Sequence, residues 1–222
     1  MNFYAFDLAG HRLEAHPSGV LWWPEERLLA VSDLHLGKAE RLARRGGALL
    51  PPYETQDTMN RLESEVARLN PATVVSVGDS FDDLTAAGSL DTALSERLAR
   101  MAAGRRWIWI AGNHDPGPVN VTGSHLSGYS LCGITLRHIA DEPSPDISGH
   151  YHPKARLWIK GQAITRPCFL VDRNRVILPA FGTYTGGLRI DDRVFDTLVS
   201  PDAVAVLTGK RAVAIPRAAA LV

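Results

Sequence analysis

Carboxylates that follow a buried strand are the residues around which the chemistry of this chain is organised. The short, mostly β-branched run Thr73–Val77 ends at Gly78 and is followed by Asp79, Asp82 and Asp83. Such a run is typical of a buried strand in an α/β sheet, where ligands collect beyond the strand ends. A carboxylate in this place can contact two metal ions at once, and Asp79 is our candidate for that role.

Four further motifs carry potential metal ligands, and most of them follow strand-like runs. They are Asp33 and His35 in a DxH pattern, Asn113 and His114 in GNHD, the single His138, and His150 and His152 in GHxH. In extended backbone, residues two apart project to the same side, so that Asp33 and His35 can clamp one ion. Each motif alone also fits a solvated turn or a structural histidine. The order of all five is what predicts a metal centre.

Alternating strands and amphipathic helices are expected to position these residues. Apolar residues spaced three and four apart predict helices over Thr55–Leu69 and from Leu90 to Gly104. Strand patterns are found at Thr73–Val77, Trp107–Ala111, Arg156–Ile164 and Cys168–Pro179, and hairpins at Phe3–Leu13, Gly19–Ser32, Tyr129–His138 and Ala203–Ile215. The alternation predicts an α/β fold, and the whole chain, residues 1–222, is expected to form one domain.

Composition narrows the class of protein without naming a partner. Lys plus Arg and Asp plus Glu each total 24, so that no global charge indicates nucleic acid. The local cluster Lys38–Arg45 could meet phosphates, or form a solvated helix face. Cys132 and Cys168 match no zinc-binding or redox spacing and predict reduced core thiols in the cytoplasm. No apolar stretch reaches the roughly 18 residues of a membrane span, so we expect no membrane association.

The ordered motifs between Asp33 and His152 resemble those of the calcineurin-like metallophosphoesterase superfamily. The resemblance implies an αββα sandwich, that is, two mixed β-sheets flanked by helices. It also implies that Asp33, His35 and His152 hold one metal, that Asn113, His138 and His150 hold a second, and that Asp79 bridges both. His114 is then the catalytic group, placed to protonate the leaving oxygen or to stabilise the charge on it. Asp82 is expected to orient His114, with Asp83 as the alternative, because spacing does not decide between adjacent carboxylates.

The implied ligand set makes chemical sense for two divalent ions. Carboxylate, amide and imidazole favour Mn²⁺, Fe²⁺ or Zn²⁺ over soft metals, which would use thiolates. Of these we expect Mn²⁺ in use. Two such ions about 3.5–4 Å apart can turn a bridging water into hydroxide and hold the phosphoryl oxygens during in-line displacement. Hydrolysis of a phosphate ester follows from this arrangement.

Three segments give a narrower resemblance, to the bacterial ligase-associated DNA damage response metallophosphoesterases. The segments are Ser32–Lys38, Leu136–His138 and Leu178–Gly187. This subgroup implies a manganese-dependent phosphodiesterase or DNA endonuclease that works in DNA repair beside a DNA ligase, a helicase and an exonuclease. The expected substrate is then DNA, single-stranded in particular.

Three functions are compatible with these residues. The first is the two-metal DNA endonuclease. The second is a phosphatase or small-nucleotide phosphodiesterase on the same metals, because the ligand set fixes the reaction and not the substrate. The third is a non-catalytic interaction module on the same scaffold. Hydrolysis of diester, monoester, cyclic nucleotide and DNA in the presence of manganese would separate them.

Overall fold

A computed structural model describes residues 2–47, 51, 53–83, 85, 88, 90–117, 120–142 and 145–220. The helices are α1 (Lys38–Arg44), α2 (Glu54–Leu69) and α4 (Thr92–Ala102), with the 3-10 helices η1 (Arg193–Asp196) and η2 (Arg217–Ala220). The first seven strands are β1 (Tyr4–Leu8), β2 (His11–Ala15), β3 (Leu21–Trp23), β4 (Leu28–Ser32), β5 (Thr73–Val77), β6 (Arg106–Ile110) and β7 (Ser124–Leu126). The remaining strands are β8 (Gly128–Leu131), β9 (Ile134–Arg137), β10 (Asp146–Ser148), β11 (Lys154–Ile159), β12 (Gln162–Val171), β13 (Arg175–Ile177), β14 (Val204–Leu207) and β15 (Val213–Pro216).

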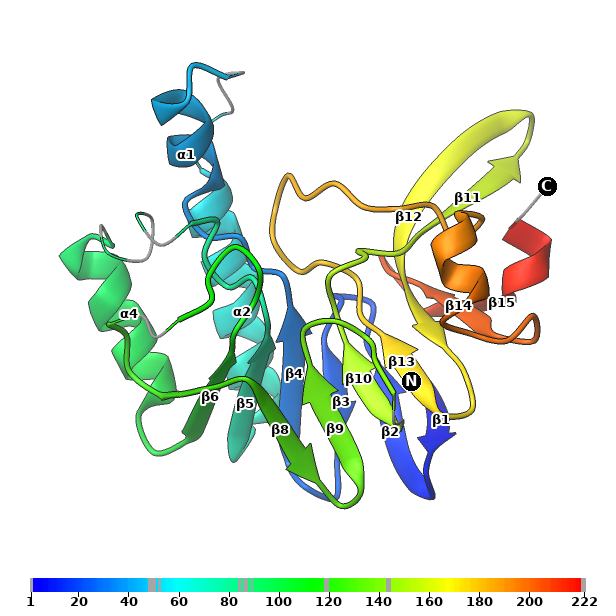
Figure 1. The fold of residues 1–222 in the computed structure, drawn as a ribbon, viewed down its shortest axis with the longest axis horizontal. Helices are drawn as coiled ribbons and strands as arrows, with labels where there is room; N and C mark the ends of the chain where they lie inside the picture. The colour runs from blue at the N-terminus through cyan, green and yellow to red at the C-terminus, as the bar shows by residue number, and fades with distance from the viewer. Residues whose placement is uncertain are drawn as a thin grey trace.

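Two mixed β-sheets pack face to face, which confirms the predicted sandwich (Figure 1). The first sheet has the order β1-β2-β3-β4-β5-β6-β7, and β4, β5, β6 and β7 are parallel neighbours. The second has the order β15-β14-β12-β13-β10-β9-β8, in which β10 is parallel to both β9 and β13. Parallel neighbours bring their carboxyl ends to one edge, and that edge carries the motifs.

Strand β4 shows why the central strands read as unbroken apolar runs. All five of its residues are buried. Leu28 and Ala30 face the core between the sheets, whereas Leu29 and Val31 face the core beneath the helices. Because both faces are covered, the alternation of polar and apolar residues that marks a half-exposed strand is absent.

The helices α2 and α4 cover the outer face of the first sheet. In α2, Met59, Leu62 and Val66 are buried at the predicted spacing and pack into the same core as Leu98 of α4. Asp91 caps the N-terminus of α4 by accepting a hydrogen bond from the backbone N–H of Leu94. Among the helices in the described ranges, none has the length and apolar character needed to cross a membrane.

The second sheet differs from the symmetric αββα expectation. Its outer face packs against the segment that carries η1, with Phe195 fully buried beside Leu170 and Ala205. Within the part of the chain that the structure describes, the helices of this layer are the short η1 and η2 and not α-helices. The sheet arrangement is thus as predicted, whereas the second helical layer is much thinner.

Candidate metal centre

Five loops at one edge of the sandwich carry the predicted ligands. Asp33 and His35 follow β4, Asp79 follows β5, and Asn113 and His114 follow β6, which are neighbours in the first sheet. His138 follows β9, and His150 and His152 follow β10, which are neighbours in the second sheet. The centre therefore lies where the carboxyl ends of parallel strands from both sheets meet, as expected for α/β folds.

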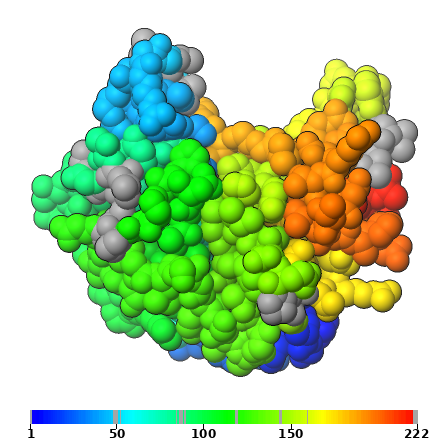
Figure 2. Space-filling view, in the orientation of Figure 1, coloured from blue at the N-terminus to red at the C-terminus, as the bar shows by residue number. Residues whose placement is uncertain are grey.

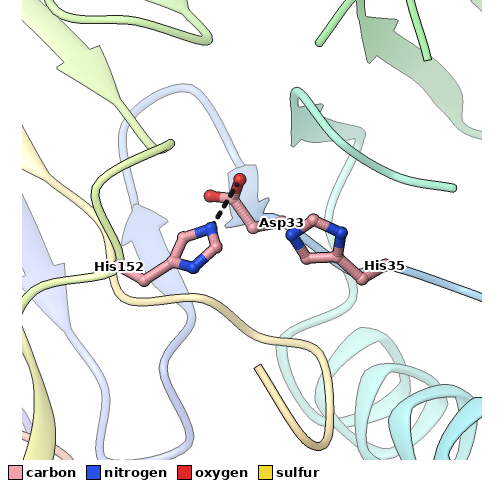
Figure 3. A group of neighbouring side chains, drawn as sticks. All are labelled: Asp33, His35 and His152. Atoms are coloured by element: carbon pink, nitrogen blue, oxygen red, sulfur yellow. Dashed lines mark ion pairs between the residues drawn. The ribbon is translucent and has the colours of Figure 1, made fainter. Parts of the chain in front are cut away.

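The first cluster contains Asp33, His35 and His152 (Figure 3). One ligand atom from each residue lies within 4.8 Å of the others, and Nε2 of His152 is 3.0 Å from Oδ1 of Asp33. Figure 3 shows the Asp33 carboxylate between the two imidazole rings. Asp33 is fully buried and His35 is 4% exposed, so that neither group can rely on bulk water for its polar contacts.

The second cluster contains Asp79, His138 and His150, with Asn113 beside them. Nε2 of His138 lies 2.9 Å from Oδ1 of Asn113, 3.2 Å from Nδ1 of His150 and 3.4 Å from Oδ2 of Asp79. Three lone-pair atoms thus surround a single imidazole nitrogen, which has at most one proton to give. A cation satisfies such a set of donors better than hydrogen bonds do.

The two clusters share a boundary at Asp33. Its Oδ1 atom lies 3.9 Å from Nδ1 of His138, and its Oδ2 atom accepts a hydrogen bond of 3.0 Å from the backbone N–H of His150. Asp79 belongs to the second cluster through its contacts with His138 and His150, and its Oδ1 atom accepts a hydrogen bond of 2.8 Å from the backbone N–H of His114. The two groups are therefore adjacent, as a binuclear centre requires.

Buried atoms without hydrogen-bond partners indicate that the donors fit metal ions. Nε2 of His35 is buried and makes no hydrogen bond, and the buried atoms Oδ1 of Asp33 and Nε2 of His152 have no such partner except each other. Leaving such groups unsatisfied costs about 1–3 kcal/mol each, and more for a charged group. Metal coordination at the first cluster would satisfy all three atoms together.

The electrostatics of the second cluster favour a charged carboxylate. Burial alone would raise the pKa of Asp79, but the hydrogen bond and charge of His138, with the N–H of His114, lower it to about 2. Burial lowers the pKa of His150, and the neighbouring His138 adds to this effect. Asp79 is thus ionised at neutral pH and His150 is neutral, which are the forms that bind metal. Although burial opposes it, Asp79 and Asp33 raise the pKa of His138, so that this ring must give up a proton when metal binds.

Asp82 is positioned differently from the sequence expectation. Its carboxylate lies 2.9 Å from Nδ1 of His35 and pairs with Nε of Arg41, instead of reaching His114 by a hydrogen bond. The contact to His114 comes from the backbone, because Nδ1 of His114 lies 2.9 Å from the carbonyl oxygen of Asp82. Asp83 pairs with Arg44 at 3.0 Å, so that two arginines of the Lys38–Arg45 cluster are neutralised by carboxylates.

The side-chain carboxylate and the backbone carbonyl of Asp82 orient two different histidines. A carboxylate on Nδ1 of His35 leaves Nε2 of that ring for a metal and fixes the ring orientation, as outer-shell carboxylates do at many metal sites. The carbonyl oxygen of Asp82 can only accept, so Nδ1 of His114 carries the proton in this contact. Nε2 of His114 is then the nitrogen left for substrate.

Two further polar residues, to which the sequence assigned no role, support the loops. Asp115 accepts hydrogen bonds from the backbone N–H groups of Phe81 (3.0 Å) and Gly112 (3.1 Å), and thereby ties the loop after β5 to the loop after β6. Burial raises the pKa of Asp115 to about 6, although these N–H groups oppose the rise. Ser32 donates from Oγ to the Asp33 carboxylate. Asp115 stands in the GNHD motif, so its signal was present but fits a turn equally well.

Comparison with known proteins agrees with this geometry. The family model of calcineurin-like phosphoesterases matches residues 26–197. The chain belongs to the calcineurin-like phosphoesterase family. This confirms the resemblance drawn from the motifs, and it makes the chain a metal-dependent phosphoesterase with the α/β metallophosphoesterase fold. A search of curated proteins gives no match.

Two solved structures are similar to this calcineurin-like phosphoesterase. The nuclease MPE of Pseudomonas putida has a TM-score of 0.75 and 26% sequence identity, and the alignment covers 96% of this chain and 100% of the nuclease. Yfce, a phosphoesterase from E. coli, has a TM-score of 0.40 and 13% identity, with 85% and 98% of the two chains covered. The first likeness extends over nearly the whole fold, including the segments outside the family model.

Proposed function

We propose that the chain is a two-metal phosphodiesterase that cleaves single-stranded DNA. The observation that carries this proposal is the adjacency of the Asp33–His35–His152 and Asp79–His138–His150 groups, which together offer ligands for two ions. Asn113 completes the second group through its contact with His138. The likeness to the nuclease MPE over 96% of the chain supports a nucleic acid as the substrate, and the subgroup resemblance supports DNA as its form.

The residues around the centre have separate tasks in the proposed reaction. Metals bound by the two groups would supply an activated water near neutral pH and neutralise charge on the phosphoryl oxygens. His114 acts in its doubly protonated form: Nδ1–H donates to the Asp82 carbonyl oxygen, and Nε2–H gives its proton to the leaving oxygen. The Asp79 carboxylate accepts a hydrogen bond from the backbone N–H of His114, which links a metal ligand of the second cluster to the proton donor.

Manganese is the proposed metal. Two carboxylates, one amide oxygen and four imidazoles form a mixed oxygen and nitrogen set, without a thiolate, that suits Mn²⁺, with Fe²⁺ or Zn²⁺ as substitutes. Asp79 as the ligand shared by both ions also remains a proposal. Its two oxygens face His138 and the N–H of His114, so that the shared role requires one of them to turn toward the first group.

The biological role, the location and the domain organisation are proposed from the sequence resemblance and the structure. The subgroup resemblance supports a role in DNA repair with a DNA ligase, a helicase and an exonuclease. A cytoplasmic location is supported by Cys132 and Cys168, which form no disulfide in the structure. Both were expected in the core, but only Cys168 is buried and Cys132 is exposed. A single domain over residues 1–222 is supported by a core cluster that draws side chains from both sheets.

The test is hydrolysis by metal-stripped protein after addition of Mn²⁺. We expect cleavage of bis-p-nitrophenyl phosphate and of single-stranded DNA, with loss of about 100-fold or more in both for His150→Ala, since a metal ligand is removed. His11→Ala is the matched control and should retain activity, because His11 lies in β2, pairs with Glu25 and is not among the proposed ligands. Turnover of monoesters or cyclic nucleotides with intact DNA would replace the nuclease by the second hypothesis. Absence of bound metal after manganese incubation would favour a non-catalytic module.

A further inference from the structure

The metal centre lies between two projecting arms of the fold. Helix α1 and the β11–β12 hairpin rise beyond the same edge of the sandwich (Figure 1), and Figure 2 shows a hollow between them. Both arms begin next to ligands of the first cluster, because α1 starts three residues after His35 and β11 starts two residues after His152. Any polymer that passes over the metal centre along this hollow must run between the two arms.

One face of the hairpin is directed toward the hollow. Alternate residues of a strand share a face, so that Lys154, Arg156 and Trp158 stand on one side of β11, whereas Ala155 and Leu157 stand on the other. Ala155 is fully buried in the core beside η1, and Leu157 packs against that core. Nζ of Lys154 donates to the carbonyl oxygen of Thr185, in the loop between the arms. The face with Trp158 is therefore the face on the side of the metal centre.

Trp158 is a large apolar side chain left open to solvent. It is 59% exposed, the highest value among the exposed large hydrophobic residues in the described ranges. Its neighbour across the hairpin is the small Ala163, and Thr165 stands opposite Arg156. The guanidinium of Arg156 lies 5.3 Å from the centre of the indole ring, which holds the ring in place and leaves surface for a second planar partner.

Positive charge faces the hollow from both arms. Lys38 stands at the start of α1 and Lys154 at the start of β11, so that each arm carries a cation where it leaves the metal centre. In the part of the chain that the structure describes, neither Lys38 nor Arg156 takes part in an ion pair. An anionic chain between the arms would pair with these cations.

We propose that the β11–β12 hairpin is a strand-binding arm, in which Trp158 stacks on an unpaired base of single-stranded DNA and Arg156 and Lys154 contact its phosphates. The proposal rests on the nuclease function proposed above and adds a substrate-binding surface outside the metal centre. An exposed aromatic ring within a row of cations is the arrangement by which proteins hold single strands. A duplex keeps its bases stacked and paired, so its bases cannot use Trp158 in this way.

The test compares a small diester with an oligonucleotide. For Trp158→Ala we expect oligothymidylate binding, measured by fluorescence anisotropy, and kcat/KM for its cleavage to fall about tenfold or more, as for other stacking residues. Trp158→Phe, which keeps a ring, should retain most of both. Hydrolysis of bis-p-nitrophenyl phosphate should be unchanged in either variant, because this substrate is too small to span from the metals to the hairpin.

Two arginines on opposite faces of the same hairpin, Arg156 and Arg166, provide a test variant and its matched control. Arg156→Gln should weaken oligonucleotide binding and lower the slope of log K against log salt by about 0.7, the value for one phosphate contact on a single strand. Arg166 stands opposite Ala155, on the other face of the hairpin, and Arg166→Gln should change neither quantity.

Three outcomes would overturn the proposal. The first is wild-type oligonucleotide affinity in Trp158→Ala, and the second is equal affinity of the wild-type protein for duplex and single strand. The third is a concentration-dependent dimer in sedimentation that Trp158→Ala abolishes, which would assign the surface to a second copy of the chain. If the wild-type protein cleaves no diester at all, the proposed function fails instead, and the binding measurements still decide the role of the hairpin.

Discussion

Removal of the Asp82 carboxylate should weaken metal binding more than it impairs proton transfer. This carboxylate is fully buried, lies 2.9 Å from Nδ1 of His35 and also pairs with Arg41. Loss of such an outer-shell partner typically lowers metal affinity about 10- to 100-fold. We therefore expect Asp82→Ala to lower the affinity for the more weakly held Mn²⁺ by this factor, which corresponds to about 1.4–2.8 kcal/mol.

The choice of substitution affects the magnitude. Asp82→Ala also deprives Arg41 of its partner, and breaking a buried pair costs about 3–5 kcal/mol; because Arg41 is 17% exposed and retains some water, we expect the lower end of this range or less. Asp82→Asn keeps the size of the side chain and an oxygen that can accept from His35. Its effect on metal affinity should be about tenfold, with little change in fold stability.

The assay follows manganese binding and catalysis separately. Bound metal is measured after dialysis against a series of Mn²⁺ concentrations, and rates are measured at saturating Mn²⁺ with bis-p-nitrophenyl phosphate and with DNA. Nitrophenolate leaves without protonation, whereas the alkoxide leaving group of DNA needs a proton. If Asp82 acts on His35, both substrates should show the same shift in manganese dependence.

The opposite pattern would refute this reasoning. If Asp82→Asn leaves manganese affinity unchanged and lowers kcat for DNA alone, the carboxylate acts on His114, as the sequence hypothesis had it. Asp83→Asn is the control at the adjacent position. Its carboxylate pairs with Arg44 at 3.0 Å and is 22% exposed, so that we expect metal affinity and rates within about twofold of the wild type.

Two further predictions concern packing and pH. A Cβ at Gly149 would lie 1.8 Å from Oγ of Ser32, so Gly149→Ala should destabilise the fold by about 1–3 kcal/mol and reduce the amount of bound metal. Gly186→Ala is the control, because a Cβ there meets nothing within 4 Å. Thermal denaturation with metal analysis checks this, and equal melting temperatures of the two variants would contradict it. Burial, and then the charge of Arg68, lower the pKa of His16 from 6.5 to about 4. Because the unfolded chain takes up this proton first, stability is full above pH 6.5 and falls by up to about 3 kcal/mol toward pH 4. In urea denaturation His16→Gln should lose this slope, and an unchanged pH profile would show that other groups cause it.

The sequence predicts those parts of the centre that depend on strand order. Thr73–Val77 forms β5 as expected, and Asp79 follows it beside the loop after β4. Local pattern suffices here, because parallel neighbours must present their carboxyl ends at one edge. The three-residue strands β7 and β10 were not predicted, since three residues are too few to show a period.

Roles that depend on tertiary partners could not be predicted in this way. Asp82 and Asp83 are adjacent carboxylates in the sequence, and the structure separates them through α1, on which Arg41 and Arg44 stand three residues apart and take one carboxylate each. Where α1 lies relative to the loop after β5 depends on tertiary contacts, which a local sequence pattern does not show. The same reason explains why two arginines of the Lys38–Arg45 cluster, for which phosphate contact or a solvated helix face had both stayed open, are paired with carboxylates.

The ligand loops themselves have a backbone that no periodic pattern describes. Asp33, His35, Asp79, His150 and His152 all have positive φ, between 42° and 69°. The expectation that Asp33 and His35 meet through extended backbone is therefore wrong, although both do reach the first cluster. Asp and His enter the left-handed region more readily than most residues, but each still costs about 1 kcal/mol or more.

Five such residues cost about 5 kcal/mol, which is comparable to the net stability of many domains. Hydrogen bonds between the loops offset part of this cost, because pairing continues beyond the strands. The N–H of Asp33 donates to the carbonyl oxygen of Gly78 (3.2 Å), and the N–H of His35 donates to that of Asp79 (3.0 Å). The loops after β4 and β5 thus hold each other in the strained form. Because this pairing is independent of any ligand, the donors are arranged before metal arrives, and binding free energy need not be spent on ordering them.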